Sequence, residues 1–178
     1  MASGDVELTL DELREVARFA LGAAQSVLPV FEEACPDDPR PRVALDAARV
    51  FADGAPRTRL QRTASMDAHR AAADAPTEPA RLAAQAAGDA ASAAYLHPIA
   101  RAHQVGHILR ASANAARIAE LAAGDDPAVG LASIEAAGLR ATPVLVEVLG
   151  RYPAAPAGRG RPAVLMAALD AALRDSAR

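Results

Sequence analysis

The chain has 178 residues, of which 52% are hydrophobic and only 3% aromatic, and a formal net charge of −3. This length suits one domain with a sizeable core of small and aliphatic side chains. The near balance of 19 basic and 22 acidic residues argues against a nucleic-acid-binding protein, which carries a basic excess. The single cysteine, Cys35, excludes an intramolecular disulfide and a cysteine zinc cluster.

The N-terminal residues lack the basic segment and apolar run of a signal peptide, and no stretch reaches the roughly 18 apolar residues of a membrane span. Every basic residue is arginine, and alanine, glycine, proline and aspartate are abundant, which indicates a GC-rich coding genome such as that of an actinobacterium. We therefore expect a cytoplasmic protein without a membrane or nucleic-acid partner, and without a metal or other cofactor.

The first third of the chain predicts three helices after a mobile lead at residues 1–8. Thr9 and Glu12 form a capping box that opens the first helix, and Pro29 is expected to kink or end it. Asp38 is expected to cap a second helix that starts at Pro39 and runs to about residue 53. Its predicted inner stripe is Val43, Ala47, Val50 and Phe51. A third helix is predicted over residues 57–73, with a buried side of Leu60, Ala64, Met66, Ala68 and Ala71.

The remaining helices follow from equally local signals. Residues 77–124 read as two alanine-rich helices that meet at a single interruption, His97-Pro98, and Thr77 caps the first of them. Asp126 caps a sixth helix that reaches about Gly150, with a kink at Pro143. A Pro/Gly-rich loop at 151–162 precedes a last helix over 163–177. Because no segment shows strand alternation, we predict an all-α single domain over 1–178, a bundle of about seven antiparallel helices without a β-sheet.

Asp89 is the most informative polar residue in this pattern. It lies among small residues where a helix should be tightly packed: Ala86, Ala87, Gly88, Ala90 and Ala91. A carboxylate buried there must be paired or hydrogen-bonded, and Arg49 or Arg70 is the expected partner. Two interpretations stay open at this point, a structural ion pair and a pocket with a shifted pKa.

Several residues are candidates for an acid/base site between helices. Its catalytic carboxylates would be Asp46, Asp67 and Asp89. The substrate would be held by Arg42, Arg49, Arg70, Tyr95, His97 and His103. The alternative for Arg42, Asp46, Arg49 and Asp53 is a solvated helix face of alternating charges.

The histidines give only weak evidence for a metal site. His103 and His107 are four residues apart, which is the spacing of two metal ligands on one helix. Gln104 follows His103 where the zinc-protease motif requires glutamate, so we expect core or surface histidines without a metal. No serine lies in a nucleophile elbow, and no glycine motif of phosphate-binding type occurs.

Four segments carry a resemblance to a known family: DDPRPRVALDAARVFADG (37–54), DAHRAA (67–72), AAGDAASAAYLHPIARAHQVGHILRASANAARIAE (86–120) and RATPVLVEVLGRYPAAP (140–156). They resemble immunity proteins with an Imm-5-like domain, which are small helical proteins common in actinobacteria. Phe51 stands where members often carry tryptophan, and Asp89 stands near a position where they carry histidine. The resemblance implies a protein that binds and neutralises a toxin made by the same cell.

Three functional hypotheses follow. The first is a cytoplasmic immunity-type protein that occludes a toxin stoichiometrically, with a partner-facing surface at the 36–42 loop and the Arg49 face. The second is a cofactor-independent enzyme of secondary metabolism that closes a ring, moves a proton or displaces a leaving group on a small-molecule metabolite. The third is a structural or oligomerising helical module, such as a homodimer. The sequence leaves the choice between binding and catalysis open.

Overall fold

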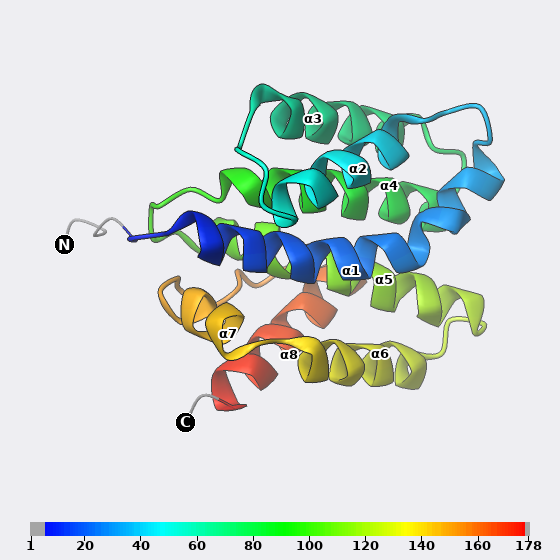
Figure 1. Ribbon diagram of the computed structural model, residues 1–178. Coiled ribbons are helices and arrows are strands. Elements are labelled where there is room, and N and C mark those ends of the chain that lie inside the picture. The colour runs from blue at the N-terminus through cyan, green and yellow to red at the C-terminus, as the bar shows by residue number, and fades with distance from the viewer. Residues whose placement is uncertain (1–5, 177–178) are drawn as a thin grey trace.

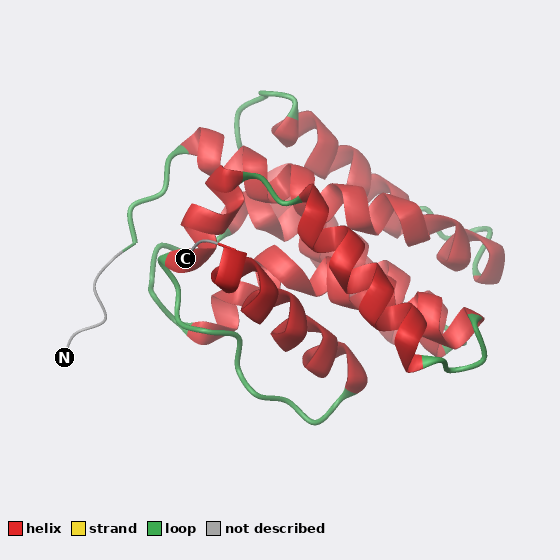
Figure 2. Ribbon diagram, turned by 90° about the horizontal axis from the view of Figure 1, so that it is seen from below, coloured by secondary structure: helices red, strands yellow, loops and turns green. Residues whose placement is uncertain are grey.

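The structure is a computed structural model that describes residues 6–176, and this part of the chain is a stack of helices joined by loops (Figures 1 and 2). The helices are α1 (Leu10–Ala34), α2 (Arg40–Ala52), α3 (Arg59–Asp74), α4 (Glu78–Ser92), α5 (Val105–Ala122), α6 (Pro127–Arg140), α7 (Pro143–Gly150) and α8 (Arg161–Ser176). Two short 3-10 turns, Ala93–Tyr95 and Ala102–Gln104, lie between α4 and α5. No strand occurs among the described residues, so the all-α prediction is confirmed.

The eighth helix arises at Pro143, where the predicted single helix is in fact two. The axes of α6 and α7 differ by 104°. The residue before a proline avoids the helical region, and proline itself suits the first position of a new helix. Thr142 completes the break, because its hydroxyl accepts the Leu145 N–H at 3.2 Å. Pro29 behaves differently, since α1 continues through it to Ala34.

The break between α4 and α5 is wider than the predicted interruption at His97-Pro98. Residues 96–101 form a loop, and α5 starts only at Val105. Side chains bind both backbone polar groups of one loop residue, because Gln104 accepts the His97 N–H at 2.9 Å and the Tyr152 hydroxyl donates to the His97 carbonyl at 2.9 Å. His103 therefore belongs to a 3-10 turn instead of sharing one α-helix with His107.

Residues 6–8, which precede α1, contact the helical bundle. Residues 1–5 of the predicted mobile lead lie outside the described part of the chain. Val6 is buried, and its N–H donates to the Pro98 carbonyl at 2.5 Å. The Glu7 carbonyl accepts from the Arg151 guanidinium at 2.7 Å, so residues 6–8 are tied to the fold.

The predicted capping box of α1 is present, and it is linked to α7. The Glu12 N–H donates to the Thr9 hydroxyl at 3.2 Å, and the Thr9 N–H donates to the Glu12 carboxylate at 2.8 Å. Arg151 bridges this carboxylate at 2.6 Å and that of Glu147 at 2.8 Å. The hydrogen bond from Arg151, followed by that from Thr9, lowers the pKa of Glu12 to about 2.

Replacing Glu12 by glutamine is expected to make the free energy of unfolding less sensitive to acid pH. The pKa of Glu12 is lowered in the folded state, so its stabilising contribution is present above its ordinary pKa of 4.5 and is lost as the pH falls towards 2. Wild type should lose about 1–2 kcal/mol more than Glu12→Gln across that window, after allowance for solvent screening. Urea titrations at several pH values measure this, and Glu135→Gln, at an exposed site on α6, is the control. Equal acid sensitivity of Glu12→Gln and wild type would contradict the assignment.

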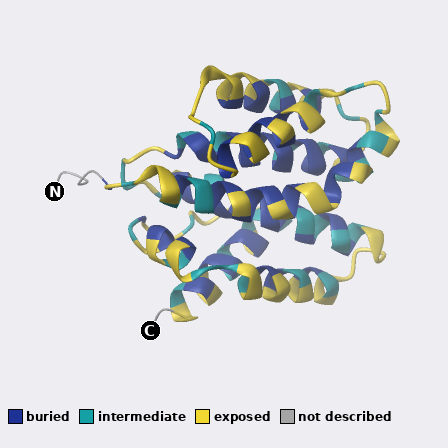
Figure 3. Cartoon of the chain, in the orientation of Figure 1, coloured by how far each residue is buried: buried dark blue, intermediate teal, exposed yellow. Residues whose placement is uncertain are grey.

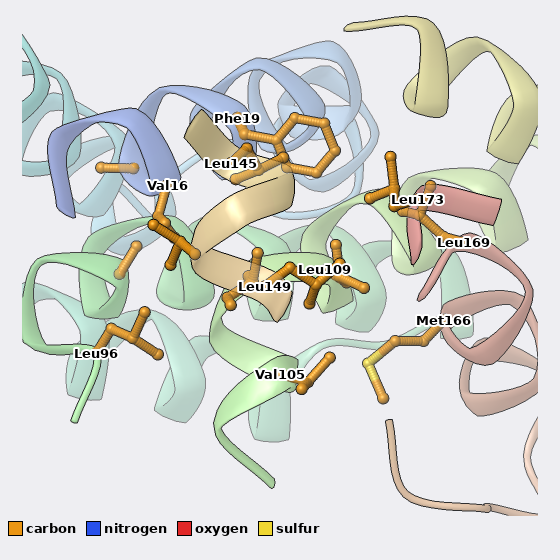
Figure 4. Close-up of a cluster of buried hydrophobic side chains, with 14 of the residues drawn as sticks. Val16, Phe19, Leu96, Val105, Leu109, Leu145, Leu149, Met166, Leu169 and Leu173 are labelled. Carbon is orange, nitrogen blue, oxygen red and sulfur yellow. The ribbon is translucent and has the colours of Figure 1, made fainter. Parts of the chain in front are cut away.

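The first of the two alanine-rich helices lies at the centre of the bundle. Helix α4 packs against α1, α2, α3 and α5, and its alanines and Gly88 are almost fully buried (Figure 3). Small side chains let the neighbouring backbones approach closely, which explains the few aromatic residues in the core. One core cluster lies among α1–α4 and one side of α5. A second joins α1 and α5 to α7 and α8 through Phe19, Leu109, Leu149 and Leu169 (Figure 4). No single described helix is both long and apolar enough to cross a membrane, although the bent pair α6–α7 meets the length and composition criteria together.

Two of the predicted buried stripes are partly wrong. On α2, Ala47 and Phe51 are buried, whereas Val43 and Val50 are 45% and 50% exposed. The buried face of α2 is turned towards Ala44, Leu45 and Ala48, because α1, α3 and α4 all pack on that side. On α3, Ala64, Ala68 and Ala71 set the buried face, and Leu60 and Met66 are each 50% exposed. On α7, Val144 is 43% exposed.

Candidate functional site

The fully buried carboxylate of Asp89 is the centre of a polar cluster between α3, α4 and α5. Arg110 from α5 holds it with two hydrogen bonds, Nε to Oδ2 at 2.8 Å and Nη2 to Oδ1 at 2.5 Å. Such a bidentate pair of charged groups is stronger than hydrogen bonds between neutral groups. Neither Arg49 nor Arg70 is the partner, because each pairs with an aspartate of its own helix. Arg110 was not identified from the sequence.

His69 from α3 is the second group beside Asp89. Its Nε2 atom lies 3.6 Å from Asp89 Oδ1, and the side chain is 38% exposed. The ring can approach α4 so closely because residue 88 is glycine. A Cβ at Gly88 would lie only 2.8–2.9 Å from three atoms of the His69 ring. Gly88 therefore leaves space for the His69 ring, and the next residue, Asp89, places its carboxylate beside that ring.

His107 and Ser92 complete the cluster on the other side. His107 Nδ1 lies 2.9 Å from Ser92 Oγ, and the Ser92 hydroxyl also lies 2.9 Å from the Asp89 carbonyl, to which it donates. Burial lowers the pKa of His107, and the Asp89 carboxylate only partly offsets this. A neutral His107 with its proton on Nδ1 satisfies both bonds, because it donates to the oxygen of Ser92. The serine is thus hydrogen-bonded into the helix junction and is not activated as a nucleophile.

The cluster presents positive charge outwards. The Arg110 side chain is 43% exposed although its partner Asp89 is completely buried. The hydrogen bond to Asp89 raises the pKa of Arg110, so the guanidinium stays charged. Its Nη1 group makes no hydrogen bond with Asp89 and remains available to a carboxylate or carbonyl from outside. This arrangement can hold an acidic group of a partner, whereas it offers no second carboxylate for acid/base chemistry.

The three predicted catalytic carboxylates do not come together. Asp46 pairs with Arg49 at 3.2 Å on the exposed side of α2, and Asp67 pairs with Arg70 at 2.6 Å on α3. Among the described residues, neither forms a hydrogen bond or an ion pair with Asp89. The sequence could not reveal this, because each aspartate lies on a different helix and the packing angles decide which side chains meet.

The remaining predicted binding residues fall into two groups. Arg42 pairs with Glu32 of α1 at 2.5 Å, and together with Asp46 and Arg49 it borders a cavity of about 170 Å³ between α1 and α2. Three others lie around the α4–α5 connection: Tyr95, His97 and His103. The Tyr95 hydroxyl donates to the Thr58 carbonyl at 2.6 Å, the His97 side chain is exposed, and His103 Nε2 lies 2.8 Å from Gln104 Nε2.

A family model described as "Imm-5 like putative immunity protein" matches residues 7–137, which is more than half of the chain. The chain belongs to this family. No curated protein and no solved structure matches it. The Imm-5-like region contains α1 to α5 and most of α6, and with them every residue of the Asp89 cluster. Helices α7 and α8 lie beyond the Imm-5-like region and cover α1, α5 and α6.

Proposed function

We propose that the protein binds a protein toxin and neutralises it by one-to-one occlusion in the cytoplasm. The observation that carries this proposal is membership of the immunity family over residues 7–137. The geometry favours binding over catalysis, because the predicted acid/base residues are dispersed and Asp89 is fully occupied by Arg110.

The outer face of α2 and α3 is the surface we assign to the toxin. Val43 and Val50 on α2, and Leu60 and Met66 on α3, are each about half exposed. These two helices pack against each other at one edge of the stack, as Figures 1 and 3 show. Large apolar side chains left in water on adjoining helices favour a partner that covers them. Charged groups surround the valines and supply the polar rim of such an interface: Arg42, Asp46 and Arg49.

Survival of a bacterial host tests the proposal. The chain is co-expressed with each protein encoded beside its own gene, and growth is compared with and without the chain. We expect one neighbour to stop growth alone, and to become harmless and co-purify at a one-to-one ratio when the chain is present. Protection by substoichiometric amounts of the chain would indicate catalytic turnover instead, and toxicity that the chain never relieves would refute the proposal.

Replacing Val43 by glutamate is expected to weaken toxin binding about tenfold or more without unfolding the protein. The change places a charge in an apolar contact area, and the exposed position tolerates it in the free protein. The matched control is Val164→Glu on α8, since Val164 is 46% exposed, as Val43 is at 45%, and lies outside the matched family region. Isothermal titration with the toxin from the survival screen measures both. Equal affinities of the two variants for the toxin would show that Val43 of α2 does not lie in the interface.

A further inference from the structure

A cavity between α1, α5 and α6 has no role in the proposed toxin contact. Helices α1 and α6 both pack on α5 but barely touch one another, so α5 forms the floor of the gap between them. The cavity has a volume of about 390 Å³, within the range of roughly 300–1,000 Å³ that is typical of small-molecule sites. Alanines make up much of its wall, which leaves it apolar along most of its length: Ala115, Ala116, Ala119, Ala122, Ala136 and Ala137.

Two polar groups at this cavity lack a partner among the described residues. Ser112 on α5 is 3% exposed, and its hydroxyl makes no hydrogen bond. The other two serines of the wall behave as helix serines usually do, because Ser26 donates to the Ala23 carbonyl and Ser133 to the Val129 carbonyl. The second group is the exposed Arg140 at the end of α6, whose side chain forms no ion pair or hydrogen bond within residues 6–176. A buried hydroxyl without a partner is costly, so Ser112 needs an explanation.

The helix register brings Ser112 and Arg140 to the same end of the cavity. Helices α5 and α6 are consecutive, connected by residues 123–126, and packed against each other, so they run antiparallel. Ser112 lies ten residues before the end of α5, and Arg140 is the last residue of α6, so both are far from the connecting turn. The opposite end lies towards Ala122, about 15 Å along α5 from Ser112, and the α5 residues that line the cavity between them are all apolar. The cavity thus has a cationic, hydrogen-bonding end and an apolar end.

We propose that this cavity binds a medium-chain carboxylate. The Arg140 guanidinium pairs with the carboxylate, and Ser112, after rotation about its Cα–Cβ bond, donates its hydroxyl to the same group. The alkyl chain lies along the alanines towards Ala122. Charge complementarity selects an anion over an alcohol or an amine of the same length. A second cavity of about 200 Å³ shares Arg140 and is lined along α1 by Glu15, Arg18, Phe19 and Gly22. The Glu15 carboxylate in it is paired with Arg18 at 3.0 Å.

Titration of the ¹⁵N-labelled full chain with sodium octanoate at pH 7 tests the proposal. We expect saturable shifts of amide signals on α1, α5 and α6, and weaker or absent shifts with 1-octanol and octylammonium. Arg140→Gln should weaken octanoate binding about tenfold or more, as expected for loss of a charge-assisted pair. Ser112→Ala should weaken it severalfold, and Ala119→Phe should abolish it by filling the cavity.

Arg62→Gln is the matched control, because Arg62 is also an exposed helical arginine without an ion pair among the described residues. It should bind octanoate as wild type does. The proposal is overturned if octanoate causes no saturable shifts, if octanol binds equally well, or if either Arg140→Gln or Ser112→Ala retains wild-type affinity. Circular dichroism on each variant separates loss of binding from loss of fold.

Discussion

Replacing Arg110 by alanine is expected to lower the free energy of unfolding by about 3 kcal/mol. The change leaves the Asp89 carboxylate, which is completely buried, without the two hydrogen bonds that Arg110 donates. His69, at 3.6 Å and 38% exposed, cannot replace a forked pair. Removal of one partner from a buried pair is far more costly than removal of both, because it leaves an uncompensated charge in the core. Urea denaturation followed by circular dichroism measures the loss.

The matched control for Arg110→Ala is Arg70→Ala on the neighbouring helix. Arg70 also pairs with an aspartate, but its side chain is 63% exposed and that of Asp67 is 39% exposed. Exposed pairs contribute about 0–1 kcal/mol, so this variant should remain close to wild type. Losses of similar size in the two variants would show that burial of Asp89 does not set the cost. The double variant Asp89→Ala, Arg110→Ala should recover part of the stability, because it removes the orphaned charge.

Replacing Gly130 by alanine is expected to cost about 3 kcal/mol, although alanine favours helices. A Cβ at position 130 would lie 1.9 Å from Glu120 Oε1 and 2.4 Å from its Cδ. Glu120 cannot move aside freely, because Arg161 binds it through Nε at 3.0 Å and Nη2 at 2.5 Å, and Arg117 donates to it at 3.0 Å. The same hydrogen bonds lower the pKa of Glu120, with Arg161 as the main cause, so the carboxylate is charged where the methyl group would go. Overpacking and a disturbed ion network together produce the loss.

The matched control for Gly130→Ala lies on the same helix. A Cβ at Gly138 would meet nothing within 4 Å, so Gly138→Ala should stabilise the protein by up to about 1 kcal/mol through helix propensity. In a thermal melt the two alanine variants should shift the midpoint in opposite directions, Gly130→Ala downwards by roughly 6–10 °C. Shifts of the same sign would mean that contact with Glu120 does not decide the outcome at Gly130.

The Glu120 network also links the family-matched region to the rest of the chain. Glu120 and Arg117 lie in α5, within residues 7–137, whereas Arg161 begins α8 outside that range. Glu120 is only 1% exposed, and its carboxylate is bound both by Arg117 of the matched region and by Arg161 of α8. Helix α8 is therefore tied to α5 through a buried carboxylate.

Features that depend on neighbours along the chain were predictable from the sequence. The caps by Thr9, Thr77 and Asp126 bond backbone groups only two or three residues away, and all three are present. Asp38 accepts the Arg40 N–H at 3.1 Å, but the N-cap of α2 is Pro39 and the helix starts one residue later than predicted. The capping box of Thr58 with Gln61 was overlooked, even though the same local signal marks it. Local geometry fixes such contacts, so no knowledge of packing is required.

Features that depend on how helices pack were decided by the tertiary structure. Arg110 is 21 residues from Asp89, and Arg161 is 41 residues from Glu120, so no spacing rule connects them. The rotation of α2 about its axis exposes Val43 and Val50, because contacts from α1, α3 and α4 bury the opposite side. The sequence by itself therefore determined the helical class, most helix ends and the small-residue face of α4. Only the packing of these helices determined which charges meet at Asp89, because each ion pair needs two elements brought together at one angle and one register.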